Sequence, residues 1–274
     1  MKKHILSIAS LLAIISLNSC LQHEVTINLK KDGSGTFVEE TRMPAGILLG
    51  ALSSTASSNE EEAEAKDPMK DLLKDPMKDL LSEEKAKKRA KELGKGVTFV
   101  KAEPVTLGEY NGARITYRFD DINKLRISAG DGMDKMNSEM EESDELKNDK
   151  KHIVFNYKSG VLSIQPQPHN DEKKPADKNE VTEEQSPEEM HMMKKVLTDM
   201  KFSMKLIIDS GIAETNASHR ENNTITIMEM DMNKVFENPD NMKKLSALES
   251  LSDALKTIDG IKVETKPEVT IKLK

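Results

Sequence analysis

Four consecutive residues, Met190-His191-Met192-Met193, place three thioethers beside an imidazole. Soft sulfur ligands together with an imidazole suit Cu(I). Met190 and Met193 are also spaced as neighbours on one face of a helix, and methionine fills irregular gaps in cores. The chain has 16 methionines but only six phenylalanines, three tyrosines and no tryptophan, which favours the core interpretation. We therefore expect no metal and no other cofactor, and these four residues are the candidates if copper binds.

Asp209-Ser210-Gly211 and His219 include the residue types of a hydrolase triad. A nucleophilic serine needs a base within hydrogen-bonding reach, commonly beside a glycine-rich turn that exposes its hydroxyl. The sequence contains no G-x-S-x-G elbow, no H-E-x-x-H zinc motif and no phosphate-binding loop. We therefore expect no catalytic residues and a protein that is not an enzyme.

The only cysteine, Cys20, follows a basic start and an apolar run over residues 5–17. This run is shorter than the ~20 residues that a membrane-spanning helix requires, and it is typical of a secretory signal. The residues Leu17, Asn18, Ser19 and Cys20 resemble the bacterial lipobox, in which signal peptidase II cuts before a cysteine that carries diacylglycerol. The alternatives are an ordinary signal peptide with a nearby cysteine, or a buried N-terminal helix.

The lipobox divides the chain into a signal peptide at 1–19 and a mature protein at 20–274. Several acyl chains would hold the mature protein stably on a membrane, and no disulfide could form within it. Leu21 stands where an aspartate would signal inner-membrane retention in enteric-type bacteria. We therefore expect a lipid-anchored protein of the bacterial cell envelope, on the outer membrane and facing the periplasm.

The composition narrows the classes of partner. The formal net charge is -7 and the pI is near 5.6, whereas nucleic-acid binding needs concentrated lysine and arginine. Because tryptophan is absent and tyrosine and phenylalanine are few, stacking platforms for sugars or single-stranded bases are not expected. The expected partners are the membrane, and with it a lipid or an envelope protein, but no nucleic acid.

Most of the mature chain consists of alternating apolar and polar residues interrupted by turn residues. Near the N-terminus Val25, Ile27 and Leu29 share one face, and Asp32-Gly33-Ser34-Gly35 then predicts a hairpin turn. Because the strands follow one another as hairpins, we expect one α+β domain with an antiparallel β-sheet and helices packed on one face. The predicted strand-rich stretches are 24–42, 97–119, 152–166, 202–211, 223–232 and an edge-like strand within 262–274.

Three insertions are predicted within this domain. Residues 66–81 are one octapeptide written twice, KDPMKDLLKDPMKDLL. Eight residues overshoot two helical turns by about 80°, so the two copies could not share one helical face. We expect a tolerated surface insertion in a helical segment at about 50–96, with a helix from about Pro76 to Leu93 that Gly94 ends. The others are an acidic insertion at about 129–150 and a mobile linker at about 167–187.

Three stretches, VTINLKKDGSGT, IIDSGIAETNA and ENNTITIMEMD, together resemble the LppM-type bacterial lipoprotein domain family and related envelope lipoproteins. The sequence departs from that pattern by its octapeptide repeat, its acidic insertions and the lack of a C-terminal membrane helix. It also has Ile227 and Met228 where the family has tryptophan. The resemblance implies an envelope lipoprotein with an α+β domain and no catalytic residue. The matching turn residues are Asp32, Gly33, Gly35, Gly211, Asn216 and Ala217.

Three functional hypotheses follow. The leading one is a membrane-anchored envelope lipoprotein whose domain is a non-enzymatic binding or structural module. The second is a carrier or binder of a lipid or other hydrophobic ligand in the periplasm, since a flexible methionine lining suits variable acyl chains. The third is a hydrolase or a metal protein.

Overall fold

The computed structural model describes residues 21–45, 76–128, 152–166, 194, 197–238, 240–241 and 258–274. Among them the chain forms two β-sheets, and three α-helices and one 3₁₀ helix are defined. The predicted signal peptide, acidic insertion and linker lie outside these residues, as does the first copy of the octapeptide.

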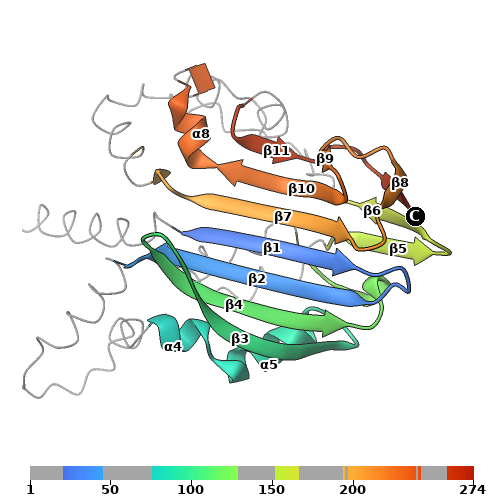
Figure 1. The fold of residues 1–274 in the computed structure, drawn as a ribbon, viewed down its shortest axis with the longest axis horizontal. Helices are drawn as coiled ribbons and strands as arrows, with labels where there is room; N and C mark the ends of the chain where they lie inside the picture. The colour runs from blue at the N-terminus through green and yellow to red at the C-terminus, as the bar shows by residue number, and fades with distance from the viewer. Residues whose placement is uncertain are drawn as a thin grey trace, which may run out of the picture.

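The larger sheet has eight strands and runs across the whole width of the molecule (Figure 1). Its order is β11-β10-β7-β1-β2-β4-β3, and β9 pairs with β10. The bounds are β1 (Gln22–Leu29), β2 (Gly35–Pro44), β3 (Val97–Leu107), β4 (Tyr110–Phe119), β7 (Lys201–Ile208), β9 (Arg220–Glu221), β10 (Thr224–Asp231) and β11 (Ile261–Val263).

The strands predicted as hairpins pair antiparallel, which confirms the local pattern for β1–β2 and β3–β4. The prediction of an entirely antiparallel sheet is wrong at one place, because β1 and β7 are parallel with Gln22 opposite Lys201. Parallel strands are joined by a long connection, so a pattern of hairpins between adjacent strands cannot predict that two distant strands pair in parallel. The N-terminal strand therefore lies in the interior of the sheet.

The smaller sheet, in the order β5-β6-β12-β8, brings together three distant parts of the chain. The C-terminal strand β12 was expected at an edge but lies between β6 and β8. Pro267 precedes this strand and so removes no hydrogen bond from its ladder, while Val269, Ile271 and Leu273 are buried. The bounds are β5 (Val154–Lys158), β6 (Val161–Gln165), β8 (Ile212–Thr215) and β12 (Val269–Leu273).

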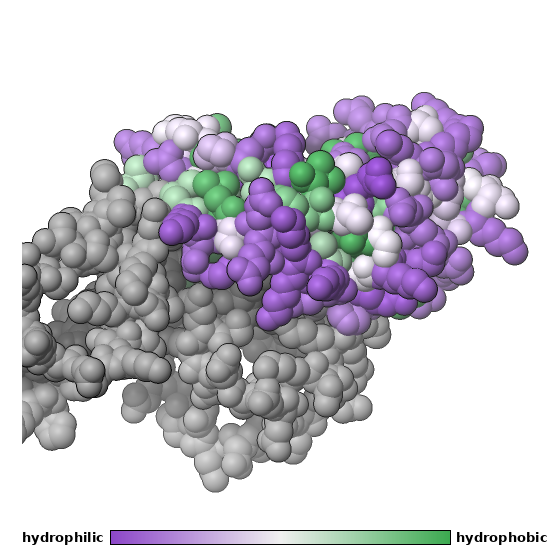
Figure 2. All heavy atoms as spheres, turned by 90° about the horizontal axis from the view of Figure 1, so that it is seen from below, coloured by the Kyte–Doolittle hydropathy of each residue, from purple (hydrophilic) through white to green (hydrophobic). Residues whose placement is uncertain are grey.

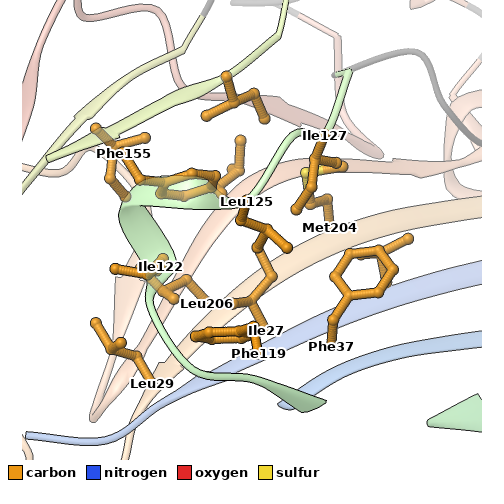
Figure 3. Packing of buried hydrophobic residues seen from close by; sticks show 14 of the residues in the cluster. Ile27, Leu29, Phe37, Phe119, Ile122, Leu125, Ile127, Phe155, Met204 and Leu206 are labelled. Carbon is orange, nitrogen blue, oxygen red and sulfur yellow. The ribbon is translucent and has the colours of Figure 1, made fainter. Parts of the chain in front are cut away.

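The two sheets share one hydrophobic core (Figure 3). The 3₁₀ helix η1 (Ile122–Lys124) and the following Leu125 contribute fully buried side chains between them. Each large apolar side chain buried in this way contributes about 1.5–3 kcal/mol relative to exposure to water. The residues labelled in the core are Ile27, Leu29, Phe37, Phe119, Ile122, Leu125, Ile127, Phe155, Met204 and Leu206.

The predicted helix at 76–93 is divided into α4 (Pro76–Leu80) and α5 (Glu83–Glu92). Ser82 causes the division, because its hydroxyl accepts a hydrogen bond from the amide of Lys85 and so caps a new helix. Gly94 follows α5 with φ +128°, and a Cβ there would lie 2.1 Å from the Lys124 carbonyl oxygen. The predicted start at Pro76 and the stop at Gly94 are both confirmed.

Helices cover the larger sheet only in part among the described residues. Helix α5 buries Ala86, Ala90 and Leu93 in the core beside β3, whereas the smaller sheet covers much of the remaining face. Helix α8 (Met232–Glu237) follows β10 and packs in a separate small cluster that includes Ile258. None of the described helices has the length and hydrophobicity needed to cross a membrane.

Candidate functional site

The predicted lipidation segment ends next to the first described residue, Leu21. The Lys201 amide at the start of β7 donates a 3.1 Å hydrogen bond to the Leu21 carbonyl oxygen. The fold therefore holds the chain one residue after Cys20. The predicted signal-peptidase and attachment residues lie outside the described part, and so do the four copper candidates: Leu17, Asn18, Ser19, Cys20, Met190, His191, Met192 and Met193.

The first turn that carries the family resemblance joins the two sheets. Asp32 accepts hydrogen bonds from the amide and hydroxyl of Ser34, which lower the pKa of its carboxyl. Gly33 has φ +87°, and its carbonyl accepts a 2.9 Å bond from the Ile122 amide of η1. The Tyr157 ring of β5 packs over Gly33, and its hydroxyl donates to the carbonyl of the same turn at residue 31. The turn has a structural role.

The second set of matching residues closes the smaller sheet. Asn216 donates from its side-chain amide to the Glu268 carbonyl at 3.1 Å and accepts from the Thr270 amide at 2.7 Å. Gly211 has φ +88°, and its carbonyl accepts a 3.0 Å bond from the amide of residue 274. Ala217 is partly buried against the core. These contacts hold β8 to β12, so this set is structural as well.

The triad-like residues do not form a catalytic arrangement in the described part of the chain. His219 Nε2 lies 3.3 Å from the Val263 carbonyl oxygen. The Ser210 hydroxyl is buried and has no hydrogen-bond partner there. Among the described hydrogen bonds, none joins Asp209, Ser210 and His219, and the described residues contain no group of three or more possible metal ligands.

The outer face of the larger sheet, which points away from the core, carries a charged network across its strands. On the β2–β4–β3 side, Arg114 lies between Glu40 and Glu103, and its 2.7 Å hydrogen bond to Glu40 raises the pKa of the guanidinium. On the β7–β10–β11 side, Glu229 lies between two lysines. The remaining pairs of the network are Lys101–Glu103, Arg42–Glu40, Arg42–Glu24 and Lys201–Asp231.

A shallow groove of about 220 Å³ lies at the end of β1, β7 and β10 that is nearest to Leu21. It contains charges of both signs together with the buried ring of His23, which stacks on Phe202 at 5.9 Å and 17°. His23 is fixed further by a 2.9 Å hydrogen bond between its Nδ1 and the Thr41 hydroxyl. The lining residues are Gln22, His23, Glu24, Arg42, Lys201, Phe202, Ser203, Lys205, Glu229, Met230, Asp231 and Lys234.

Two groups lining the groove retain unused hydrogen-bonding capacity. Asp231 Oδ2 lies 3.2 Å from the Lys201 ammonium, but its buried Oδ1 has no hydrogen-bond partner among the residues that the structure describes. Arg42 Nε lies 3.0 Å from Glu40 Oε1 without the geometry of a hydrogen bond. An unsatisfied buried polar atom costs about 1–3 kcal/mol, so a polar ligand that reached these atoms would recover part of that cost.

The pKa of the Glu229 carboxyl is lowered by the lysines around it. Burial alone raises its pKa, but the hydrogen bond from Lys262 and the charges of Lys262, Lys205 and Lys234 outweigh burial, so the pKa is lowered from 4.5. A carboxyl whose pKa is lower in the folded than in the unfolded protein stabilises the fold at pH values above its unfolded-state pKa. This stabilisation is lost as the pH falls to its folded-state pKa. Glu229 therefore keeps its charge to a lower pH than an ordinary glutamate does.

Glu229→Gln should destabilise the protein near neutral pH, and the difference from the unaltered protein should shrink between about pH 6 and about pH 3. The reason is that protonation removes from Glu229 the same charge that the substitution removes. Urea unfolding at a series of pH values measures this difference. Glu214→Gln, at an exposed ion pair with Lys272, is the matched control and should change stability little. A difference that stayed constant with pH would contradict the assignment.

A second polar cluster lies on the core side of the sheet, at a position that the strand pattern did not single out. Glu39 of β2 accepts two 3.2 Å hydrogen bonds from Arg89 of α5. The Tyr117 hydroxyl donates to the other oxygen of Glu39 at 3.4 Å. Burial, followed by the negative charge of Glu39, raises the pKa of Tyr117 well above its usual range. The cluster fixes α5 to the sheet.

The similarity of this chain to known proteins is slight. No family model matches the chain, and no curated protein matches its sequence. The folded domain of the LppM protein of Mycobacterium tuberculosis, solved by NMR, is similar over 78% of this chain and 84% of its own length. The sequence identity is 9% and the TM-score is 0.30, which is too low to establish a common fold. The functional proposals therefore depend on this chain's own residues.

Proposed function

We propose that the protein is a lipid-anchored lipoprotein of the bacterial cell envelope whose domain acts as a non-enzymatic binding or structural module. The observation that carries the proposal is the position of the sole cysteine, at the end of a signal-like apolar run and directly before a folded domain. Several acyl chains on Cys20 would give stable membrane attachment. Because Leu21 is already hydrogen-bonded to β7, the domain would stand directly at the membrane surface.

The groove beside Leu21 is the proposed binding surface. Its charges of both signs and its unsatisfied Asp231 oxygen favour a polar ligand with donor groups, such as a lipid headgroup or a charged segment of an envelope protein. The pattern resembles an ion-pairing surface more than an enclosed apolar pocket. No chemical step is assigned to it.

Lipid carriage is the second candidate, because Phe202 and Met230 line the same groove beside the charged groups. A ligand with an apolar part and a charged part would match both kinds of residue. Native mass spectrometry of the protein, purified from membranes and stripped of its own acyl chains, distinguishes the candidates. A co-purified lipid mass favours carriage, and a ligand-free mass favours the binding or structural module.

Cys20→Ala should move the protein from the membrane pellet to the soluble fraction after a high-salt wash. The unaltered protein should incorporate a clickable fatty acid, and the variant should not, because the thiol is the attachment point. Density-gradient separation of the two membranes then tests the proposed outer-membrane location. If the variant still pelleted with membranes, or the unaltered protein took up no label, lipid anchoring would be rejected.

A further inference from the structure

The end of the larger sheet nearest to Leu21 can be defined by strand register. Gln22 of β1 lies opposite Arg42 of β2, which lies opposite Gly112 of β4, which lies opposite Val105 of β3. These four residues form one row across the sheet. Cys20 precedes Gln22 by two residues along the chain, so it lies at most about 7 Å from this row.

On the neighbouring strands, apolar and aromatic residues lie two residues beyond this row, towards the end of the sheet. Two residues beyond the row, Pro44 lies opposite Tyr110, and Tyr110 lies opposite Leu107. Side chains alternate between the faces of a strand, so these residues share the outer face with Val105. Leu107 is 58% exposed, although it borders a turn where polar residues are favoured. We call Pro44, Val105, Leu107 and Tyr110 the apolar end patch.

The outer face changes character towards this end. Glu103 and Arg114 belong to the charged network and lie two residues inward from Val105 and Gly112, on the same face. Nearer the end of the sheet, the outer-face residues of β3 are aliphatic: Val105 is partly buried and Leu107 is exposed. The view from the β3 and α5 side shows hydrophobic side chains at the surface between hydrophilic ones (Figure 2). The strand register places this change on the side of the predicted anchor (Figure 1).

We infer that the apolar end patch contacts the bilayer that carries the Cys20 lipid, so the strands of the larger sheet stand end-on to the membrane. The inference rests on the proposed lipid anchor. Adjacent strands are about 4.8 Å apart, so the patch, which extends from β2 across β4 to β3, lies between about 5 and about 14 Å from β1, the strand that begins two residues after Cys20. Leucine and tyrosine are well suited to the interfacial region of a bilayer. If the patch instead bound another protein or a second copy of this chain, it would not contact lipid.

The absence of tryptophan from the chain allows a direct test. Leu107→Trp places the sole tryptophan of the full-length, acylated protein in the patch. Val161→Trp is the control, because Val161 is 39% exposed and lies at the opposite end of the molecule from the patch. It pairs with Lys158, and the adjacent Tyr157 packs over the turn at Gly33. Each variant is reconstituted into phosphatidylethanolamine and phosphatidylglycerol vesicles with or without lipids brominated near the headgroup.

Bromolipid should quench the Leu107→Trp fluorescence at least about twofold and shift its emission to the blue, while Val161→Trp stays unquenched. Val105→Trp should behave like Leu107→Trp, and it replaces that variant if thermal unfolding shows the latter to be misfolded. Equal quenching at both ends, in protein that floats with the vesicles, overturns the orientation and leaves the anchor intact. Protein that does not float with the vesicles overturns the anchor and the orientation together.

Discussion

Glu39→Leu should lower the free energy of unfolding by about 3 kcal/mol, because it removes the buried carboxylate that accepts two hydrogen bonds from the Arg89 guanidinium. The other carboxylate beside Arg89, that of Glu92, is half-exposed and lies 3.7 Å away, so it replaces this partner only in part. The Glu39 side chain is 7% exposed and that of Arg89 is 14% exposed, so water cannot replace the lost partner easily. The Tyr117 hydroxyl loses its acceptor in the same variant. Urea unfolding followed by circular dichroism measures the change.

Two further variants show whether the loss of the buried Glu39–Arg89 ion pair is the cause. Glu39→Leu combined with Arg89→Leu should recover much of the lost stability, because apolar residues often replace a buried ion pair without net cost. Glu83→Ala removes the exposed partner of Lys87 and should cost well under about 1 kcal/mol. A Glu39→Leu effect as small as that of Glu83→Ala would show that the buried cluster does not fix α5 to the sheet.

Gly35→Ala should destabilise the protein by about 3 kcal/mol or more, since the added methyl has no space between the strands. Its Cβ would lie 1.9 Å from the Asn28 carbonyl oxygen and 2.5 Å from Phe119 Cζ. The first neighbour is backbone of β1, so relief requires β1 and β2 to separate. The thermal unfolding midpoint and the urea midpoint should both fall.

Gly160→Ala separates steric conflict from backbone strain. Gly160 has φ +80°, but a Cβ there meets no atom of the described residues within 4 Å. This variant should cost about 1–2 kcal/mol, the usual penalty for an alanine in the left-handed region. If Gly35→Ala cost no more than Gly160→Ala, the close contact between β1 and β2 would not be the constraint at Gly35.

Local features of the fold could be predicted from sequence because they depend on neighbouring residues. The period of two at Val25, Ile27 and Leu29 and the turn at 32–35 determine the first hairpin without reference to any distant segment. The parallel β1–β7 pair and the interior position of β12 depend on contacts between segments far apart in the chain. Periodicity contains no information about which distant strands become neighbours.

The candidate site was missed for the same reason. Glu24, Glu40 and Arg114 are ordinary polar residues of their own strands, and only strand register brings them into one network. The available signal was that the outward positions of several predicted strands carry charges of opposite sign. Glu39 could not be recognised as buried, because its partner Arg89 belongs to a helix that the turn pattern does not place against β2.

The central place of β1 has a consequence for the order of assembly. The half-sheet of β1, β2, β4 and β3 uses residues that leave the ribosome early, whereas the other side of β1 is completed only by β7. Until β7 arrives, one edge of the first strand offers unpaired backbone groups to any other extended chain. Contacts of such long range also slow folding. This edge of β1 would stay unpaired until the chain had been made as far as Lys201.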